Sequence, residues 1–293
     1  HEGAVTAAIS YLEEQAQLRR RDDGNIVHET TGRILVARFT EHGSRELDPH
    51  LHTHLVVLNM TNRENGDPMA SLESRVMYGE QRVAGQIYRN ALAFGLREAG
   101  YEIDADPRSG LFEIRGVPKD LIDHFSKRAE AIEDHAREHG LVGQKAQRAS
   151  FYATRKAKVK IGEAELAAQW HQRTGKRLET LQEVAALARG REGEHPAPTE
   201  RDASRAALFG LRQLETSEAV NNLGDILRTG LAAHVGEVRL DDIRPRIAAH
   251  EVLRKLLPTH TQTGDRLLTR GRTSRKSWLV GVDGSQRHRN VPE

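Results

Sequence analysis

Cysteine is absent from the 293 residues of the sequence. Its absence excludes disulfide bonds, thiolate metal sites and cysteine nucleophiles. The sequence also lacks an apolar run long enough to span a membrane and a signal-peptide pattern, so we expect no membrane partner. No Gly-x-x-x-x-Gly-Lys-Ser/Thr loop occurs, which excludes a nucleoside-triphosphate site of that type.

The total charge says little about partners, because charged residues make up 29% of the chain but the formal balance is only +2. Local runs of basic residues are more informative. They lie at residues 19–21, 155–160 and 270–276. Such a run is most often a solvated face, but it also suits contacts with phosphate groups.

Three histidines alternate with other residues in the stretch 48–59, which continues into a run of valine and leucine. Side chains on a strand alternate between its faces, so His50, His52 and His54 are expected to point to one side. Neutral imidazole is the commonest metal ligand in proteins. A solvated strand edge is the alternative, but the alternation of three imidazoles before an apolar strand favours a metal site.

The remaining pattern predicts an α+β fold, in which an antiparallel sheet carries the paired-histidine metal site, helices flank it, and a smaller, mainly helical domain follows. An amphipathic helix is expected over residues 1–19. Strands over 25–31, 33–40 and 49–59 are expected to pair in sequence. We place the first domain at 1–190, a Gly/Pro-rich linker at 191–200 and the helical domain, with a disordered tail, at 201–293. Further helices are predicted at 72–79, 81–99, 118–138, 147–158, 163–172, 178–187, 201–215, 218–233 and 240–257, with hairpins at 101–115 and in the tail.

Two motifs resemble the metal-binding region of conjugative relaxases of the MobF (F-plasmid) type. They are Phe-Thr-Glu-His-Gly-Ser-Arg at 39–45 and Asp-Pro-His-Leu-His-Thr-His at 48–54. The resemblance continues in order over about residues 1–190, and residues beyond the linker resemble, more weakly, the helical segment before a helicase. The other matching segments are 90–95, 116–118, 125–128 and 154–158.

The resemblance implies a DNA strand transferase. Such relaxases bind single-stranded DNA, nick one strand at an origin of transfer with a tyrosine that becomes linked to the 5′ phosphate, and later rejoin the strand. A divalent metal ion, for which we expect Mg or Mn with Zn as an alternative, contacts the scissile phosphate. The expected partners are origin-of-transfer DNA and conjugation accessory and secretion-system proteins, in the bacterial cytoplasm.

The family motif implies that His52 and His54 are metal ligands, while His50 is not. The third ligand of the family comes two residues after the phenylalanine, a position that Glu41 holds here. A shift of one residue would place His42 there instead. Because neighbouring strand residues face opposite ways, Glu41 and His42 remain alternatives; the carboxylate would favour harder ions.

The tyrosine nucleophile of the family has no evident counterpart in this sequence. In the family the catalytic tyrosines precede the helix that matches residues 1–19. We therefore expect a fragment without its nucleophile, inactive in strand transfer by itself. The five tyrosines, Tyr11, Tyr78, Tyr88, Tyr101 and Tyr152, are expected at core or surface positions.

Six polar residues are candidates for DNA contacts, because grooves that bind single strands combine basic side chains with stacking aromatic rings. Phe151 and Tyr152 precede the basic run at 155–160 and are candidates for stacking. Two other functions stay open: a DNA-binding module without catalysis, and an unrelated metal-dependent hydrolase with Glu41 as general base. The six candidates are Arg45, Arg89, Asn90, Arg155, Lys156 and Lys158.

Overall fold

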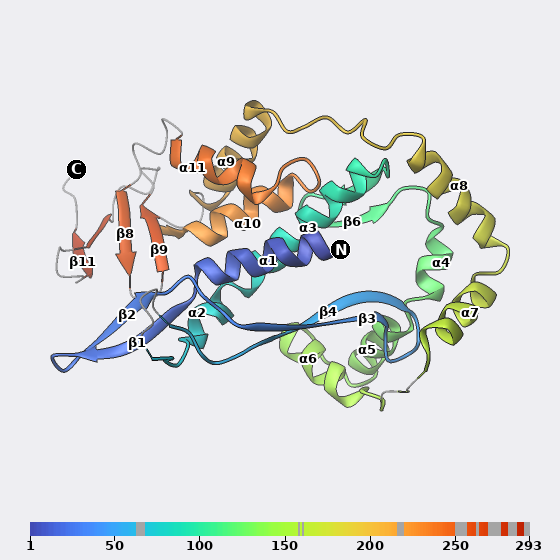
Figure 1. Ribbon diagram of the computed structural model, residues 1–293, viewed down its shortest axis with the longest axis horizontal. Coiled ribbons are helices and arrows are strands. Elements are labelled where there is room, and N and C mark those ends of the chain that lie inside the picture. Colours follow the sequence, from blue (N-terminus) through green and yellow to red (C-terminus); the bar gives the residue numbers. More distant parts are fainter. Residues whose placement is uncertain are drawn as a thin grey trace. The chain divides into compact units, whose positions relative to one another are not determined.

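The structure is a computed structural model in which helices and small antiparallel sheets alternate along the chain (Figure 1), which confirms the predicted α+β class. Among the described residues, no helix is both long and apolar enough to cross a membrane. The residues described are 1–62, 68–157, 159, 161–215, 220–249, 257–261, 264–268, 277–280 and 286–289.

Helices make up most of the regular structure. Among the described residues they are α1 (Glu2–Glu14), α2 (Ser74–Gly79), α3 (Gln81–Glu98), α4 (Lys119–His124), α5 (Lys127–Glu138), α6 (Gln144–Ala153), α7 (Glu163–Thr174), α8 (Arg177–Arg189), α9 (Glu200–Glu215), α10 (Leu223–Ala233) and α11 (Leu240–Ala249).

The strands form small antiparallel sheets, in which β1 pairs with β2, β3 with β4, β5 with β6 and β10 with β11, while β9 lies between β7 and β8. Their bounds are β1 (Gln17–Asp22), β2 (Asn25–Thr30), β3 (Val36–Gly43), β4 (Pro49–Val57), β5 (Ile103–Asp106), β6 (Leu111–Ile114), β7 (Val220–Asn222), β8 (Leu257–Thr261), β9 (Gly264–Leu268), β10 (Ser277–Val280) and β11 (Gln286–Arg289).

The helix predicted over residues 1–19 ends early, and its last residues begin a strand instead. Helix α1 stops at Glu14, and β1 pairs with β2 around a turn in which Asp23 (φ 45°) and Gly24 (φ 83°) both have positive φ. An Asp-Gly pair of this kind is a strong hairpin signal. The expected three-stranded sheet is therefore wrong: β2 pairs with β1, and β3 pairs with β4.

One other prediction needs correction. The helix expected over 118–138 is two helices, α4 and α5, separated at Phe125 and Ser126. The disordered tail stays a prediction; among the described residues of the tail, Arg289 of β11 pairs with Ser277 of β10. The hairpin predicted at 101–115 is confirmed by the pairing of β5 with β6.

The chain divides into two compact units, and neither is a continuous segment. Unit 1 contains His1–Val36, Val57–Glu113 and Arg191–Glu293, whereas unit 2 contains Ala37–Val56 and Ile114–Gly190. The predicted linker does not separate them. It belongs to unit 1, where Gly193 N–H donates a hydrogen bond of 2.9 Å to the Glu98 carbonyl and Arg191 pairs with Glu102.

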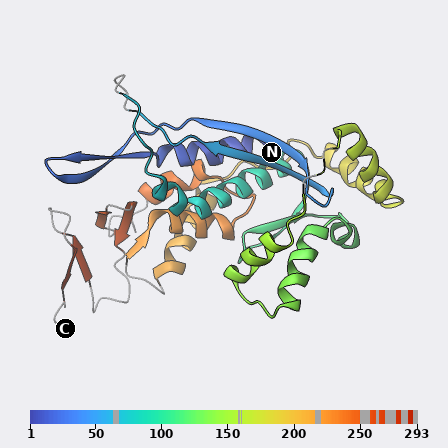
Figure 2. The ribbon, with the colours of Figure 1, turned by 90° about the horizontal axis from the view of Figure 1, so that it is seen from below.

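The core of unit 1 lies among α1, α3, α9, α10 and α11 (Figure 2). Asn90 of α3 is completely buried, and its side-chain N–H groups donate to the carbonyls of Leu231, His234 and Val238 at 3.0–3.2 Å. These bonds hold the loop between α10 and α11 against α3. A buried amide with all its donors satisfied stabilises a unique packing of such a loop.

A buried polar pair lies near the same core. The Tyr11 hydroxyl donates a hydrogen bond to a Glu80 carboxylate oxygen. Burial raises the pKa of Glu80 above its ordinary value, and burial together with the Glu80 charge raises the pKa of Tyr11. The tyrosine is therefore held protonated as a donor inside unit 1.

Helices α9 and α10 approach each other through glycines. A Cβ atom added to Gly210 would collide with the Ile226 carbonyl oxygen and would lie 3.1 Å from the Gly230 nitrogen. One added to Gly230 would lie 2.5 Å from the Ala206 carbonyl oxygen. The two backbones are thus in direct contact, which only residues without a side chain allow.

We expect Gly210→Ala to destabilise unit 1 by about 2 kcal/mol or more, because the added methyl forces α9 and α10 apart. The free energy of unfolding from urea denaturation measures this effect. Gly95→Ala is the matched control, since Gly95 also lies inside a helix but has open space around it. The control should stabilise the protein by up to about 1 kcal/mol. Equal effects of the two substitutions would contradict the proposed packing.

Candidate metal centre

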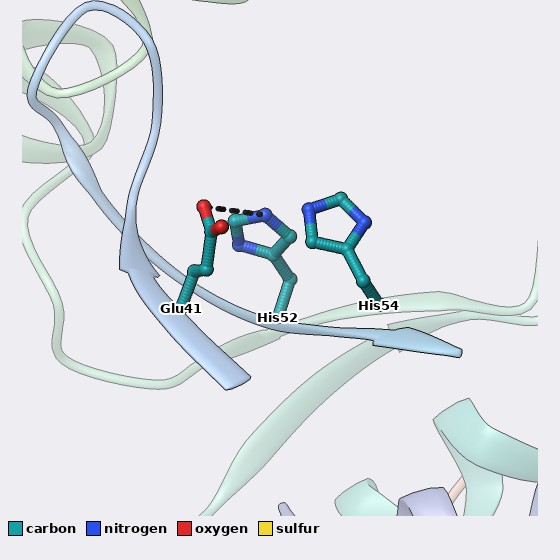
Figure 3. Close-up of side chains that lie close together, drawn as sticks. All are labelled: Glu41, His52 and His54. Carbon is teal, nitrogen blue, oxygen red and sulfur yellow. Dashed lines mark ion pairs between the residues drawn. The ribbon is translucent and has the colours of Figure 1, made fainter. Parts of the chain in front are cut away.

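Three potential ligands from two strands meet on one face of the β3–β4 ribbon in unit 2. Glu41 lies on β3, and His52 and His54 lie on β4 (Figure 3). One donor atom of each lies within 4.8 Å of the others, and this is the only group of three or more such residues found in the part of the chain that the structure describes. Side-chain alternation on β4 places His52 and His54 on the same face.

The orientation of His52 suits a metal ligand. Its Nδ1 lies 2.8 Å from the His50 carbonyl oxygen, which can only accept, so Nδ1 carries the proton. In the neutral ring the other nitrogen, Nε2, then keeps its lone pair, and it lies 3.9 Å from Glu41 Oε2. Metal-binding histidines are commonly fixed in this way by a hydrogen bond from the second ring nitrogen.

His50 lies beside the group. Its ring stacks on that of His52 with centroids 4.5 Å apart. Burial and, to a smaller extent, the neighbouring His52 lower the pKa of His50 below its ordinary value, which favours the neutral ring.

His42 has a different neighbour. Its Nδ1 lies 3.6 Å from a carboxylate oxygen of Glu163 at the start of α7. Of the two alternatives for the third ligand, the structure brings Glu41, not His42, together with His52 and His54. The donor set that the geometry offers is two imidazoles and one carboxylate, which fits a divalent ion.

The turn between β3 and β4 is held by a buried carboxylate. Asp48 is 2% exposed, and its side chain accepts hydrogen bonds from Arg173 Nη2 at 2.5 Å and from the Lys127 backbone N–H at 3.1 Å. Its backbone N–H also donates to Ser44 Oγ at 3.1 Å, and the Ser44 N–H donates to the Asp48 carbonyl at 2.9 Å. One residue therefore joins the turn to α5 and α7.

Helix α7 completes this clamp at Leu47, whose φ of 60° is unusual for a residue with a branched side chain. The Leu47 carbonyl accepts hydrogen bonds from Trp170 Nε1 at 2.8 Å and from Arg173 Nη1 at 3.0 Å. The Arg173 guanidinium also lies over the Phe125 ring, 4.5 Å from its centroid. No local sequence pattern marks Arg173 or Trp170, because both are more than 120 residues from the turn they hold.

The group of Glu41, His52 and His54 lies in a cavity of about 610 Å³ whose lining includes basic and aromatic side chains. Arg128, Phe151 and Arg155 line it together with the histidines. Arg128 donates to the carbonyls of Thr154 and Phe151 at 2.8 Å, and its guanidinium lies 5.0 Å from the Phe151 ring centroid. Arg128 thereby fixes the end of α6, from which Phe151 and Arg155 reach the cavity.

The predicted DNA-contact residues differ in exposure and in their hydrogen-bond partners. Arg155 is exposed and lines the cavity. Arg45 donates a hydrogen bond of 2.7 Å to the Lys156 carbonyl, and Lys156 Nζ lies 2.6 Å from Glu46 Oε2. Arg45 and Lys156 therefore connect the basic run to the turn between β3 and β4.

Two other candidates, Arg89 and Asn90, belong to unit 1, and the third is outside the described part of the chain. Arg89 is half-buried and donates to Gln86 Oε1 at 3.1 Å, within unit 1. Asn90 is completely buried, so its expected contact with DNA is replaced by the structural role described above. Lys158 lies outside the described residues.

The tyrosines occupy core and surface positions. Tyr11 is 3% exposed and Tyr78 is 76% exposed. The Tyr88 hydroxyl is bonded to His1 Nδ1 at 2.8 Å, and the Tyr152 ring meets that of Phe151 edge-on. Tyr101 is partly buried.

Comparisons with known proteins point to one family. The family model described as TrwC relaxase matches residues 1–177. The multifunctional conjugation protein TraI of Escherichia coli (strain K12) is 30% identical over 180 residues, which are 59% of this chain and 10% of TraI. The chain thus spans about a tenth of the length of this curated relative.

Solved structures of the conjugative relaxase TrwC are also similar, at 32% identity and 61% coverage of this chain. The metal-free complex with OriT DNA has a TM-score of 0.57 and is covered to 64%. The copper-bound complex with OriT DNA has a TM-score of 0.56 and is covered to 61%. TrwC with a 27-mer DNA comprising the recognition hairpin and the cleavage site also has a TM-score of 0.56 and is covered to 64%.

We expect Glu41→Ala and His52→Ala each to abolish or strongly weaken Mn²⁺ binding in calorimetric titrations, because each removes one of the three clustered donors. His42→Ala is the matched control and should leave the affinity unchanged, since its ring lies against Glu163. Loss of binding in His42→Ala with retention in Glu41→Ala would identify the three-histidine set instead.

Asp48→Asn should destabilise unit 2 by about 3 kcal/mol, because it leaves the partly buried Arg173 without its charge partner. We also expect weaker Mn²⁺ binding, although Asp48 is not in the donor group. Urea denaturation and calorimetry measure the two effects. Asp123→Asn, at an exposed ion pair with Lys119, is the control and should change neither. Unchanged metal affinity in Asp48→Asn would show that the ribbon keeps its shape without the clamp.

Proposed function

Because this chain belongs to the TrwC relaxase family, we propose that it is part of a conjugative relaxase that binds single-stranded origin-of-transfer DNA and holds a divalent metal ion at the phosphate to be cut. One observation carries this proposal. The group Glu41, His52 and His54 shares a cavity with the exposed basic residue Arg155 and the half-exposed ring of Phe151.

The metal ion would be held by Glu41 Oε, the Nε2 atom of His52 and one ring nitrogen of His54. When bound, it would stabilise the negative charge that develops on the phosphate oxygens during strand transfer. The carboxylate makes the donor set harder than three imidazoles, which favours Mg²⁺ or Mn²⁺ over Zn²⁺. The hydrogen bond from His52 to the His50 carbonyl keeps Nε2 directed toward the ion.

The strand would follow the basic and aromatic side of the cavity. Arg155 would contact a backbone phosphate, and Phe151 would stack on a base. Arg128 is already committed to the carbonyls of α6 and to the Phe151 ring, so its role would be to position those two residues. Arg45 and Lys156 would act in the same indirect way, by connecting the basic run to the ribbon turn.

A second surface suits duplex DNA. The β1–β2 hairpin extends beyond the end of α1 in unit 1 (Figures 1 and 2), and Arg19 and Arg21 lie on one face of it, opposite His28 and Ile26. Both arginines are exposed. A two-stranded ribbon fits the major groove of B-DNA, so this surface would bind a recognition hairpin like the one in the TrwC complex.

Strand transfer also needs a nucleophile, and we propose that none of the five tyrosines provides it. Tyr11, for example, is buried and donates to Glu80. The metal ion would then act on a phosphate that a group other than these five tyrosines attacks. Accessory and secretion-system proteins would be the further partners of such a relaxase.

The test uses a labelled single-stranded oligonucleotide that carries an OriT sequence, with Mn²⁺ or with EDTA. We expect Mn²⁺ to strengthen binding of the wild type but not of His52→Ala, as measured by fluorescence anisotropy. Arg155→Ala should weaken binding and reduce its salt dependence by about one counterion, since one phosphate contact is lost. Arg177→Ala, at a surface ion pair with Asp120, is the control.

A hairpin probe and a denaturing gel distinguish the alternatives. Arg19→Ala with Arg21→Ala should weaken binding of the hairpin while leaving that of the single strand unchanged. Metal-dependent cleavage with free ends would indicate a hydrolase, and a covalent adduct would show that one of the five tyrosines is the nucleophile. Binding that neither Mn²⁺ nor His52→Ala alters would leave only a DNA-binding module.

A further inference from the structure

The segment of residues 191–199, which leads into α9, lies against the end of α3 within unit 1. The Gly193 N–H donates a hydrogen bond of 2.9 Å to the Glu98 carbonyl, and Arg191 forms an ion pair with Glu102. One hydrogen bond and one ion pair at a protein surface contribute little stability by themselves. The segment therefore needs a further contact to stay in place.

His195 supplies that contact. Its ring lies edge-on against the Phe94 ring of α3, with centroids 5.2 Å apart and an interplanar angle of 70°. Its Nε2 atom is covered from solvent and has no hydrogen-bond partner among the residues that the structure describes. A neutral ring fits this position at modest cost. Protonation would place a buried cationic N–H there without an acceptor, which is far more costly.

The α3 side of this contact also favours the neutral ring. Arg97, three residues after Phe94, donates a hydrogen bond of 3.2 Å to the Gly236 carbonyl. Burial first, and then the charge of Arg97, lower the pKa of His195 below its ordinary value. The Gly236 carbonyl and the Glu98 charge act in the opposite direction with a smaller effect.

The charged groups of the other surrounding segments have partners of their own. In the loop between α10 and α11, His234 Nδ1 lies 2.8 Å from a carboxylate oxygen of Glu237. The Arg239 guanidinium lies over the Phe94 ring, 4.3 Å from its centroid, so this ring already contacts one cation. The acidic residues of the segment itself are both exposed to solvent: Glu192 and Glu194.

We propose that His195 is a pH-sensitive switch, which holds residues 191–199 against α3 while its ring is neutral and releases them when the ring is protonated. In the released segment the ring titrates at its ordinary pKa of about 6.5. Because the docked ring has the lower pKa, docking is at full strength above about pH 6.5. Below that, docking weakens by up to about tenfold per pH unit until the pH reaches the pKa of the docked ring. This inference does not depend on the function proposed for the ribbon.

The experiment measures the mobility of the segment with one nitroxide spin label. Since the sequence contains no cysteine, Glu192→Cys in the full chain gives a single attachment point at an exposed position. Electron paramagnetic resonance should show a slowly moving label at about pH 7.5 and a growing fast-moving fraction down to about pH 5.5, the range in which imidazole titrates. NMR titration of the His195 ring in the unlabelled protein should give a midpoint below about 6.5.

Adding His195→Phe keeps a ring beside Phe94 that cannot take up a proton, so the label should move slowly at every pH. His171→Ala, at an exposed histidine on α7, is the matched control and should keep the pH response of the labelled parent. A label that stays slow in the parent, or a fast-moving fraction that grows equally in His195→Phe, would overturn the proposal. If the added phenylalanine leaves the label fast at every pH, the NMR midpoint decides: a value of about 6.5 or higher would also overturn it.

Discussion

The hydrogen bonds that the Asp48 carboxylate accepts are the interactions on which the candidate metal centre depends. Two strands joined by a turn are only marginally stable when they stand alone, and the β3–β4 ribbon forms a sheet of just these two strands. Its geometry must be fixed from outside the sheet. Asp48 does this by accepting from the start of α5 and from Arg173 of α7 at the same time. A buried charge of this kind is tolerable only because every partner is in place.

Strand alternation is a local property, and it predicted that the histidines of β4 share one face. His52 and His54 needed only the period of two residues for this, whereas Glu41 and His42 became candidates through the resemblance to the family motif. The choice between Glu41 and His42 could not be made from the sequence, since it depends on where β3 ends and on Glu163 of α7, which lies beside His42. Local rules therefore gave the candidate residues, and a contact distant in sequence separates His42 from the group of Glu41, His52 and His54.

The strand pairing and the division into units were harder to predict. Residues 17–22 follow an amphipathic helix without a strong break. They form a strand because the Asp23–Gly24 turn pairs them with β2. Asn90 looked like a polar surface residue of α3, but its partners lie at the end of α10 and in the loop that follows it, more than 140 residues away. The role of Arg173 was unpredictable for the same reason. Burial of polar groups by distant segments leaves little local trace in the sequence.

The interleaving of the two units has a consequence for how the protein is made. Unit 1 is interrupted by residues 37–56 and again by 114–190, and its core needs α9 to α11 as well as α1 and α3. During synthesis from the N-terminus, α1 and α3 must wait for more than a hundred further residues before their apolar faces are covered. The ribbon likewise waits for Arg173 before its turn is clamped. Both units can therefore complete their folding only late in synthesis. A protein ended after α8 would contain Glu41, His52 and His54, but the apolar faces of α1 and α3 would lack the helices that cover them.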